Sequence, residues 1–176
     1  MRDRFGAEIT WLSYDLHPEY PPDGIPRAEL LARYGIGTND PMKARFEQQG
    51  LTYNPPVDVV PNTRLALQLT ELARTRGLGL QMHERLMDAY WSEARNIGDV
   101  DELRALAAEV GIDDPDVAWD DPVYLERVVA STAQAHSIGV TGVPGFLLDR
   151  RLLVLGAQPR ELFEQAFEQL HALDEP

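Results

Sequence analysis

The chain has 176 residues, of which 44% are hydrophobic and 26% are charged. This length is sufficient for one domain with a buried core, and the composition is typical of folded rather than disordered chains. No apolar run approaches the roughly 18 residues that cross a bilayer, and the first residues lack the apolar stretch of a secretory signal. We therefore expect a cytoplasmic protein.

The charge balance and the absence of cysteine exclude several classes of function. Sixteen Lys and Arg residues against 29 Asp and Glu residues give a net charge of −13, which repels nucleic acid and anionic lipid. The chain contains no cysteine. These residues therefore supply no disulfide, no Cys-ligated metal site, no iron–sulfur cluster and no thiol nucleophile.

The first predicted element is a strand over residues 8–16, a segment rich in β-branched and aromatic side chains. Its apolar residues fall on both faces, which is typical of a strand covered on both sides in an α/β sheet. Residues 17–26 contain four prolines and one glycine, so we expect an irregular connection there.

A run of helices follows. Proline, capping residues and apolar residues at helical spacing predict their positions. The predicted segments are 26–35, 39–50, 62–77, 80–91, 99–111 and a helix that opens at Asp121-Pro122. Asn62 is a candidate cap, and Asp99 with Glu102 resembles a capping box.

The end of the chain has a different pattern. Two short apolar runs, 145–149 and 152–156, flank Arg150-Arg151 and predict a β-hairpin. Pro159 then opens a last helix. We interpret residues 1–25 and 121–176 as two parts of one α/β core and residues 26–120 as a helical insertion.

Most candidate sites have a simpler structural explanation. None of the four histidines has a second ligand at metal spacing, and His83 lies beside core positions of a predicted helix, so we expect a structural histidine. Gly77-Leu78-Gly79 lacks the preceding strand of a dinucleotide-binding turn, and no Gly-x-Ser-x-Gly element is present. An acidic cluster lacks the order of a calcium-binding loop, so we expect a solvated loop that caps the next helix. The cluster consists of Asp113, Asp114, Asp116, Asp120 and Asp121.

One segment carries a more specific signal. Residues 138–149 place Val143-Pro144 after small residues and before the predicted hairpin. A proline at this position cannot donate to a β-ladder. Two interpretations stay open from the segment alone: an ordinary proline at the start of a strand, or a cis-proline turn.

The order of motifs along the chain resembles the DsbA-like thioredoxin family, of the FrnE and 2-hydroxychromene-2-carboxylate isomerase type. The matching pieces cover almost the whole chain: 16–19 with the following Pro-Pro-x-Gly loop, 62–63, 88–93, 96–99, 139–144 and 156–158. The resemblance implies an α/β thioredoxin-like (DsbA-type) sheet with a large helical insertion. It also implies that the first core strand and the Cys-x-x-Cys segment are missing here, with residues 1–6 matching the end of the family's first helix.

The resemblance implies a function of which this chain keeps ligand binding but not thiol exchange. The family members are disulfide oxidoreductases or isomerases, and a chain without cysteine is predicted inactive in thiol exchange. Thr141, Gly142, Val143 and Pro144 are the predicted substrate-binding residues, which pair with an extended peptide or glutathione. No catalytic residue, metal or cofactor is predicted, and glutathione enters as a substrate or ligand. The alternatives are a glutathione-dependent isomerase or transferase of the same fold and a non-enzymatic peptide-binding or chaperone-like protein.

The missing first strand also implies an unpaired sheet edge. In this fold that strand lies between the second strand and the strand that follows the proline. We therefore expect residues 8–16 to pair with residues 145–149, or the chain to self-associate through the exposed edge.

Overall fold

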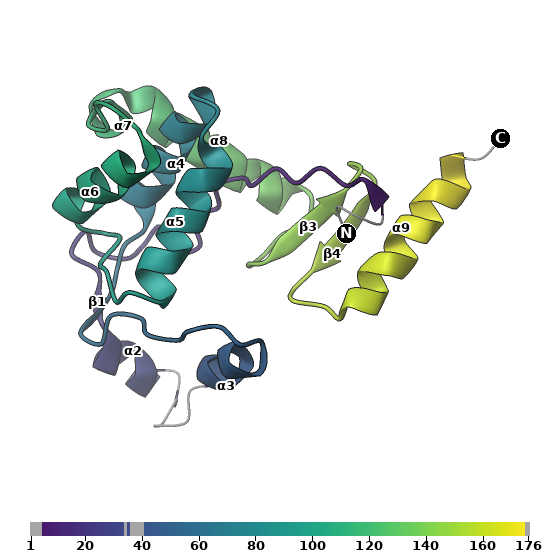
Figure 1. Cartoon of the computed structure of the whole chain (residues 1–176), viewed down its shortest axis with the longest axis horizontal. Helices are drawn as coiled ribbons and strands as arrows, with labels where there is room; N and C mark the ends of the chain where they lie inside the picture. Colours follow the sequence, from purple (N-terminus) through teal and green to yellow (C-terminus); the bar gives the residue numbers. More distant parts are fainter. Residues whose placement is uncertain (1–4, 34, 36–40, 175–176) are drawn as a thin grey trace.

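The computed structural model describes residues 5–33, 35 and 41–174. A group of packed helices lies at one end of the molecule, and a β-hairpin with the last helix lies at the other (Figure 1). The helices are α2 (Arg27–Arg33), α3 (Pro41–Gln48), α4 (Arg64–Thr75), α5 (Gly79–Trp91), α6 (Val100–Val110), α7 (Val117–Asp120), α8 (Pro122–Ser137) and α9 (Arg160–Asp174). The strands are β1 (Ile25–Pro26), β2 (Val59–Val60), β3 (Gly145–Leu148) and β4 (Leu152–Leu155).

Helix α4 forms the centre of the helical group and contacts α5, α6, α7 and α8. Its apolar residues recur at helical spacing, and Leu69 and Leu72 are buried. They pack with buried residues of the neighbouring helices, including Met82, Leu103 and Leu106. The helices predicted between residues 62 and 137 are confirmed at these positions. The start predicted at residues 39–40 lies outside the described residues.

The helix caps explain where α6 and α8 begin. The Asp99 carboxylate accepts the backbone N–H groups of Asp101 and Glu102, and Gly111 ends α6 with φ of 82°. Asp121 caps α8 by accepting the N–H of Val123 at 3.0 Å. Only half of the predicted capping box forms, because the Glu102 carboxylate binds Arg95 Nε at 2.5 Å instead of returning to Asp99.

The predicted hairpin is confirmed. Strands β3 and β4 are antiparallel, with Phe146 opposite Val154 and Leu147 opposite Leu153. Residues 149 and 150 turn the chain with φ of 48° and 56°. Helix α9 lies beside the hairpin, and the rings of Phe146 and Phe163 meet edge to face at 4.8 Å between centroids.

The predicted strand over residues 8–16 is wrong. Within the described part of the chain these residues form no ladder, and β3 has no partner except β4. The N-terminal segment instead runs from beside α9 to the helical group (Figure 1), where two of its backbone groups bond side chains of α8. The hydroxyl of Ser131 donates to the Ser13 carbonyl at 2.7 Å, and the N–H of Asp15 donates to the hydroxyl of Thr132 at 2.9 Å. A backbone held by helix side chains has no need of a neighbouring strand.

Two further elements differ from the sequence prediction. The connection over residues 17–26, expected to be irregular, ends in β1, which pairs with β2. Gly24 permits this pairing, because a Cβ at residue 24 would lie 2.5 Å from the Val60 carbonyl oxygen. The acidic cluster predicted as a loop includes the short helix α7. Asp116, the residue before α7, accepts a hydrogen bond from Arg104 Nε at 2.9 Å.

The division of the chain at residues 25 and 120 stays a prediction. Helix α8, assigned by that division to the second part of the core, packs on α4 of the helical group. Figure 1 shows α8 running from the helical group towards the hairpin. Helix α8 therefore connects the helical group to the hairpin.

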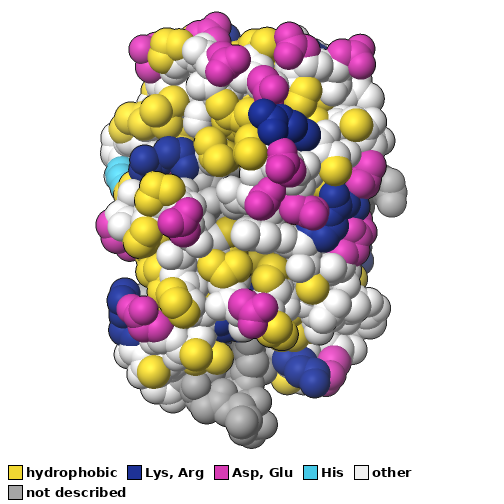
Figure 2. All heavy atoms as spheres, turned by 90° about the vertical axis from the view of Figure 1, so that its left-hand side faces the viewer, with side chains coloured by type: hydrophobic (Ala, Val, Ile, Leu, Met, Phe, Trp, Pro, Cys, Tyr) yellow, Lys and Arg dark blue, Asp and Glu magenta, His cyan; other side chains and the backbone are white. Residues whose placement is uncertain are grey.

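The surface of the helical group is mixed in charge. Figure 2 shows basic and acidic side chains next to one another on this face, with apolar side chains between them. Adjacent opposite charges limit the local field that the net charge of −13 produces.

Candidate ligand-binding loop

The predicted binding residues form a loop that begins where α8 ends. Gly139, with φ of 93°, lets the chain leave the helix. The N–H of Gly139 donates to the His136 carbonyl at 3.0 Å, and the N–H of Val140 donates to the Ala135 carbonyl at 2.9 Å. These two hydrogen bonds fix the direction in which residues 141–144 leave α8.

The other end of the loop is fixed to the hairpin. The Val140 side chain is buried against Gly145, and a Cβ at residue 145 would lie 3.1 Å from Val140 Cγ1. The N–H of Gly156 donates to the Pro144 carbonyl at 2.8 Å. Residues 141–143 therefore lie between two anchored positions.

The loop presents its backbone to solvent. Thr141, Val143 and Pro144 are exposed, Gly142 is half-buried, and 57% of Val143 is accessible. The Val143–Pro144 peptide bond is cis. Among the described residues, no hydrogen bond engages the backbone of Thr141 or Val143. The loop contains no titratable side chain, so its recognition chemistry is that of peptide N–H and C=O groups.

A second polar cluster on α8 was not predicted from the sequence. The Tyr14 hydroxyl lies 2.8 Å from His136 Nε2, one helical turn before the loop begins. With Ser131 and Thr132, His136 forms a polar row along α8 that holds residues 13–15.

His83 has a structural role, as predicted. Its ring stacks on Trp11 with 4.1 Å between centroids and 19° between planes. Burial lowers the pKa of His83, and the nearby Glu84 carboxylate partly offsets this shift. The imidazole is therefore held in its neutral form as part of the contact between the N-terminal segment and α5.

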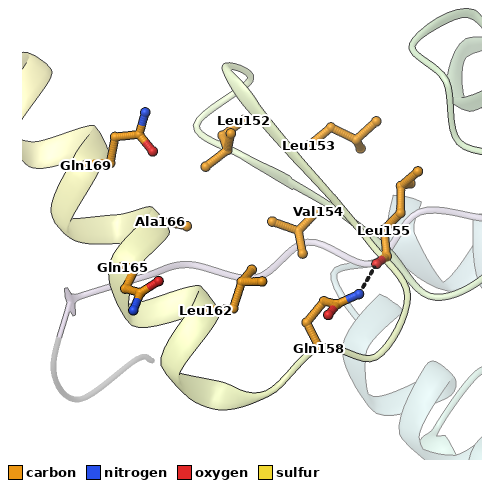
Figure 3. A pocket seen from close by; sticks show the side chains of 9 residues that line it. All are labelled: Leu152, Leu153, Val154, Leu155, Gln158, Leu162, Gln165, Ala166 and Gln169. Atoms are coloured by element: carbon orange, nitrogen blue, oxygen red, sulfur yellow. Dashed lines mark hydrogen bonds between the residues drawn. The ribbon is translucent and has the colours of Figure 1, made fainter.

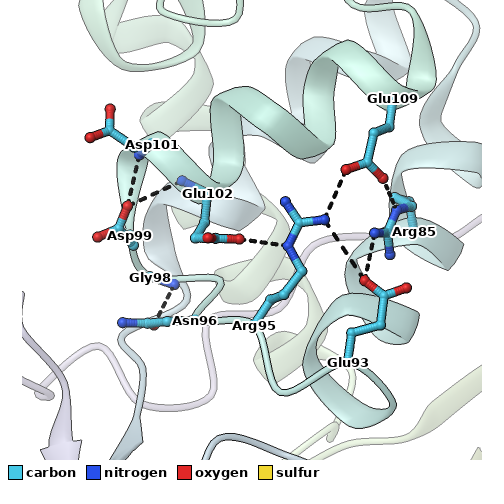
Figure 4. Close-up of polar contacts among 9 residues, drawn as sticks. All are labelled: Arg85, Glu93, Arg95, Asn96, Gly98, Asp99, Asp101, Glu102 and Glu109. Carbon is cyan, nitrogen blue, oxygen red and sulfur yellow. Dashed lines mark hydrogen bonds and ion pairs between the residues drawn. The ribbon is translucent and has the colours of Figure 1, made fainter.

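An ion-pair network joins α5, the segment that follows it and α6 (Figure 4). Arg95 donates to Glu102 at 2.5 Å and to Glu109 at 2.8 Å, while Arg85 donates to Glu109 at 2.5 Å and to Glu93 at 2.6 Å. The two guanidinium groups lower the pKa of the Glu109 carboxyl. Every one of these carboxylates has an arginine partner, so we interpret the network as a contact that stabilises the two helices. One nitrogen of the network, Nη1 of Arg85, is buried without a hydrogen-bond partner among the described residues.

No group of three or more His, Asp or Glu side chains is arranged to hold a metal ion in residues 5–33, 35 and 41–174. Over the same residues, every helix is too short or too polar to cross a membrane.

Comparison with known proteins agrees with the fold. Residues 1–168 match the family described as the DSBA-like thioredoxin domain. The uncharacterised protein YwbO of Bacillus subtilis is 30% identical over 164 residues, which are 91% of this chain and 80% of YwbO.

Two solved structures are similar. A probable DsbA oxidoreductase from Streptomyces coelicolor has a TM-score of 0.87 at 30% identity, over 99% of this chain and 80% of that chain. The cytosolic disulfide reductase DsbM from Pseudomonas aeruginosa, determined with GSH, has a TM-score of 0.56 at 22% identity and covers 74% of each chain. The second similarity concerns the fold alone. The chain thus belongs to the DsbA-like thioredoxin domain family of oxidoreductases, with a thioredoxin-like fold and a helical insertion.

Proposed function

We propose that the chain binds an extended peptide or glutathione along Thr141–Pro144 and does not itself exchange disulfides. The observation that carries this proposal is the position of Val143. The backbone N–H and C=O of Val143 have no hydrogen-bond partner among the described residues. Val143 lies two residues before β3, whose outer edge is open over the same part of the chain. A strand placed there would continue the β3–β4 sheet.

The register of the hairpin supports this mode of binding. In an antiparallel ladder, hydrogen-bonded pairs alternate with pairs whose N–H and C=O groups point outwards. The bond from Gly156 to Pro144 assigns the Phe146–Val154 and Leu148–Leu152 pairs to the bonded set. The N–H and C=O groups of Leu147 therefore point away from β4, on the same edge as those of Gly145. Together with Val143 they offer alternate peptide groups for an added strand.

The chemistry follows from composition. Thiol–disulfide exchange needs a thiolate to attack a disulfide sulfur, and the 176 residues contain no cysteine. We assign the chain to the FrnE-type branch of its family on the sequence resemblance. Its proposed place in the cytoplasm is supported by the fold that it shares with the cytosolic reductase DsbM. The two alternative functions would use the same loop. A glutathione-dependent isomerase or transferase would convert the bound molecule chemically, whereas a peptide-binding chaperone would release its peptide unchanged.

Glutathione and an unlabelled extended peptide, each titrated calorimetrically, test the proposal. Val143→Asp places a negative charge on the loop, which should weaken binding of the anionic glutathione at least fivefold. Val129→Asp is the matched control, because Val129 is also 57% exposed and lies on α8. Equal effects of the two substitutions, or no binding of either ligand, would refute the proposed site.

A second assay tests the chemistry. Insulin reduction in the presence of dithiothreitol should proceed no faster with this chain than without it. If the chain accelerated insulin reduction, the proposed inactivity in thiol exchange would be wrong. That result would not bear on the proposed binding of ligand at Thr141–Pro144.

A further inference from the structure

A solvent-accessible pair of a tyrosine and a histidine lies at the end of α8 from which the Thr141–Pro144 loop departs. The N-terminal segment passes this end of α8 (Figure 1), and the Tyr14 hydroxyl lies 2.8 Å from His136 Nε2. The two rings meet edge to face with 5.4 Å between their centroids. His136 is exposed and Tyr14 is half-buried. Within the described residues, neither side chain forms another hydrogen bond, so both keep polar atoms available to a ligand.

The backbone keeps this pair close to the loop. The His136 carbonyl accepts the N–H of Gly139 at 3.0 Å, and Thr141 follows two residues later. Two residues of extended chain span about 7 Å, whereas three residues of an extended ligand span about 10 Å. A ligand of tripeptide length that is bound along Thr141–Pro144 can therefore reach the His136 imidazole.

His136 is also the only titratable side chain between Val128 and Leu148. Histidine is the side chain that gains its charge between about pH 8 and pH 5. The neighbouring arginines are more distant, since Arg127 precedes His136 by about 14 Å along α8 and Arg150 follows the far end of β3. In this stretch of chain, His136 is therefore the group that can place a positive charge beside the loop.

The charged groups on the elements packed against α8 have partners or lie near its other end. On the N-terminal segment, the Asp15 carboxylate binds Arg64 of α4 at 3.1 Å. On α4, the Glu71 carboxylate binds Arg74 at 2.6 Å. The acidic residues of α7 and of α8 itself lie at least about 15 Å from His136 along the axis of α8, and they are Asp120, Asp121 and Glu126. An anion at the imidazole therefore meets no unpaired carboxylate of these elements.

We propose that Tyr14 and His136 bind a carboxylate of the ligand held at Thr141–Pro144, an inference that rests on the proposed function. An imidazolium carries an N–H on both ring nitrogens, and a phenol both donates and accepts. The Nε2–H of the protonated ring donates to the Tyr14 oxygen, which leaves the Nδ1–H and the tyrosine O–H for the carboxylate. Uptake of one proton thus adds the charge and sets both donors. The carboxylate is one of glutathione or the C-terminal carboxylate of a peptide.

Calorimetric titration of the chain with glutathione at about pH 8 and about pH 5.5, at constant ionic strength, tests the inference. The affinity should rise roughly fivefold or more at the lower pH, because histidine gains a proton over this range while the glutathione carboxylates stay ionised. His136→Gln should keep the two affinities within about twofold, since an amide gains no charge. His171→Gln, on α9, is the matched control, because it also removes one exposed histidine and should retain the full rise. A rise that His136→Gln leaves intact would overturn the inference.

Blocked ligands test the same contact without a variant and identify the source of the carboxylate. Glutathione is compared with its diethyl ester, and acetyl-Val-Thr-Val-Thr-Val is compared with its C-terminal amide, both at the lower pH. In at least one comparison the free carboxylate should bind roughly fivefold more tightly or better, and that comparison names the source. Equal affinities in both would overturn the inference, and the proposed function would stand if Val143→Asp still weakened binding. Failure of all four ligands to bind would overturn both proposals.

Discussion

The Ser13 hydroxyl donates to Oε1 of Glu71 at 2.7 Å, and both residues are buried, with 4% and 1% of their surface accessible. Arg74 donates to both oxygens of the same carboxylate at 2.8 and 2.6 Å. The carboxylate on α4 is therefore compensated by an arginine of its own helix, and it ties the N-terminal segment to the helical group. Burial of a charge is tolerated when it is paired in this way.

Replacing Ser13 with alanine should lower the free energy of unfolding by about 1.5–3 kcal/mol, the range for a buried hydrogen bond to a charged group. Urea denaturation measures the change. Ser137→Ala is the control, because its hydroxyl bonds the Gln134 carbonyl at the exposed end of α8 and should cost less than about 0.5 kcal/mol. Equal losses would mean that the Ser13–Glu71 bond contributes nothing specific.

Gly24→Ala should destabilise the chain more than Gly50→Ala. Both glycines have positive φ, of 79° and 68°, so both alanines incur a conformational cost of about 1–2 kcal/mol. Only at Gly24 does the new Cβ also meet backbone, the Val60 carbonyl oxygen, whereas nothing lies within 4 Å at Gly50. Thermal unfolding compares the two variants, and the same shift in both would show that the β1–β2 approach adjusts freely.

Arg95→Gln should destabilise the contact between α5 and α6, because Glu102 and Glu109 lose a shared partner. We expect a loss of about 1 kcal/mol at low salt that shrinks as the salt concentration rises, since the side chains are partly solvated. The matched control is Arg33→Gln, which breaks one exposed pair with Glu29 and should change stability by less than about 0.5 kcal/mol. A loss in Arg95→Gln that is independent of salt would point to packing rather than charge.

The stability of the chain should fall between pH 7 and pH 5 in a manner that depends on His83. Burial lowers the pKa of His83 in the folded chain, so the unfolded chain takes up a proton first, near its ordinary value of about 6.5. This contribution to stability is complete above that value and is lost as the pH falls towards the folded pKa. His83→Gln should flatten this part of the pH profile. NMR titration of the imidazole gives the pKa directly, and a value above 6.5 would contradict the assignment.

Self-association through the β3 edge should increase with salt. The open edge favours pairing, but each chain carries −13, so screening of the repulsion is needed before two copies approach. Sedimentation at about 50 mM and about 500 mM salt, between which the screening length shortens about threefold, measures the effect. Leu147→Pro should abolish it, and a monomer at every salt and protein concentration would disprove it.

Local sequence signals were sufficient for the helices and the hairpin. Asp99 and Gly111 set the ends of α6 through bonds that span only a few residues, and residue types alone reveal such bonds. Residues 8–16 have the composition of a strand, yet the backbone groups of Ser13 and Asp15 bond hydroxyls more than 100 positions away, on α8. Periodicity does not report contacts of that kind.

The same distinction applies to the sites. Small residues and a proline before an apolar run drew attention to residues 141–144, and the family resemblance gave this loop its predicted binding role. A groove between β4 and α9, lined by Leu152–Leu155, Leu162 and Ala166, was not anticipated (Figure 3). It exists only where a strand and a helix from adjacent segments lie side by side. No motif in residues 152–169 marks it.

Helix α8 links two contacts through its length. The Thr132 hydroxyl accepts a hydrogen bond from the N–H of Asp15. Seven residues later, at Gly139, the chain leaves the helix and enters the loop. A helix turns by about 100° for each residue. Deleting or inserting one residue between Thr132 and Gly139 would therefore rotate the start of the loop by about 100° relative to the Thr132 hydroxyl. Relatives that keep both contacts should conserve the spacing of this interval more strictly than the identity of the residues within it.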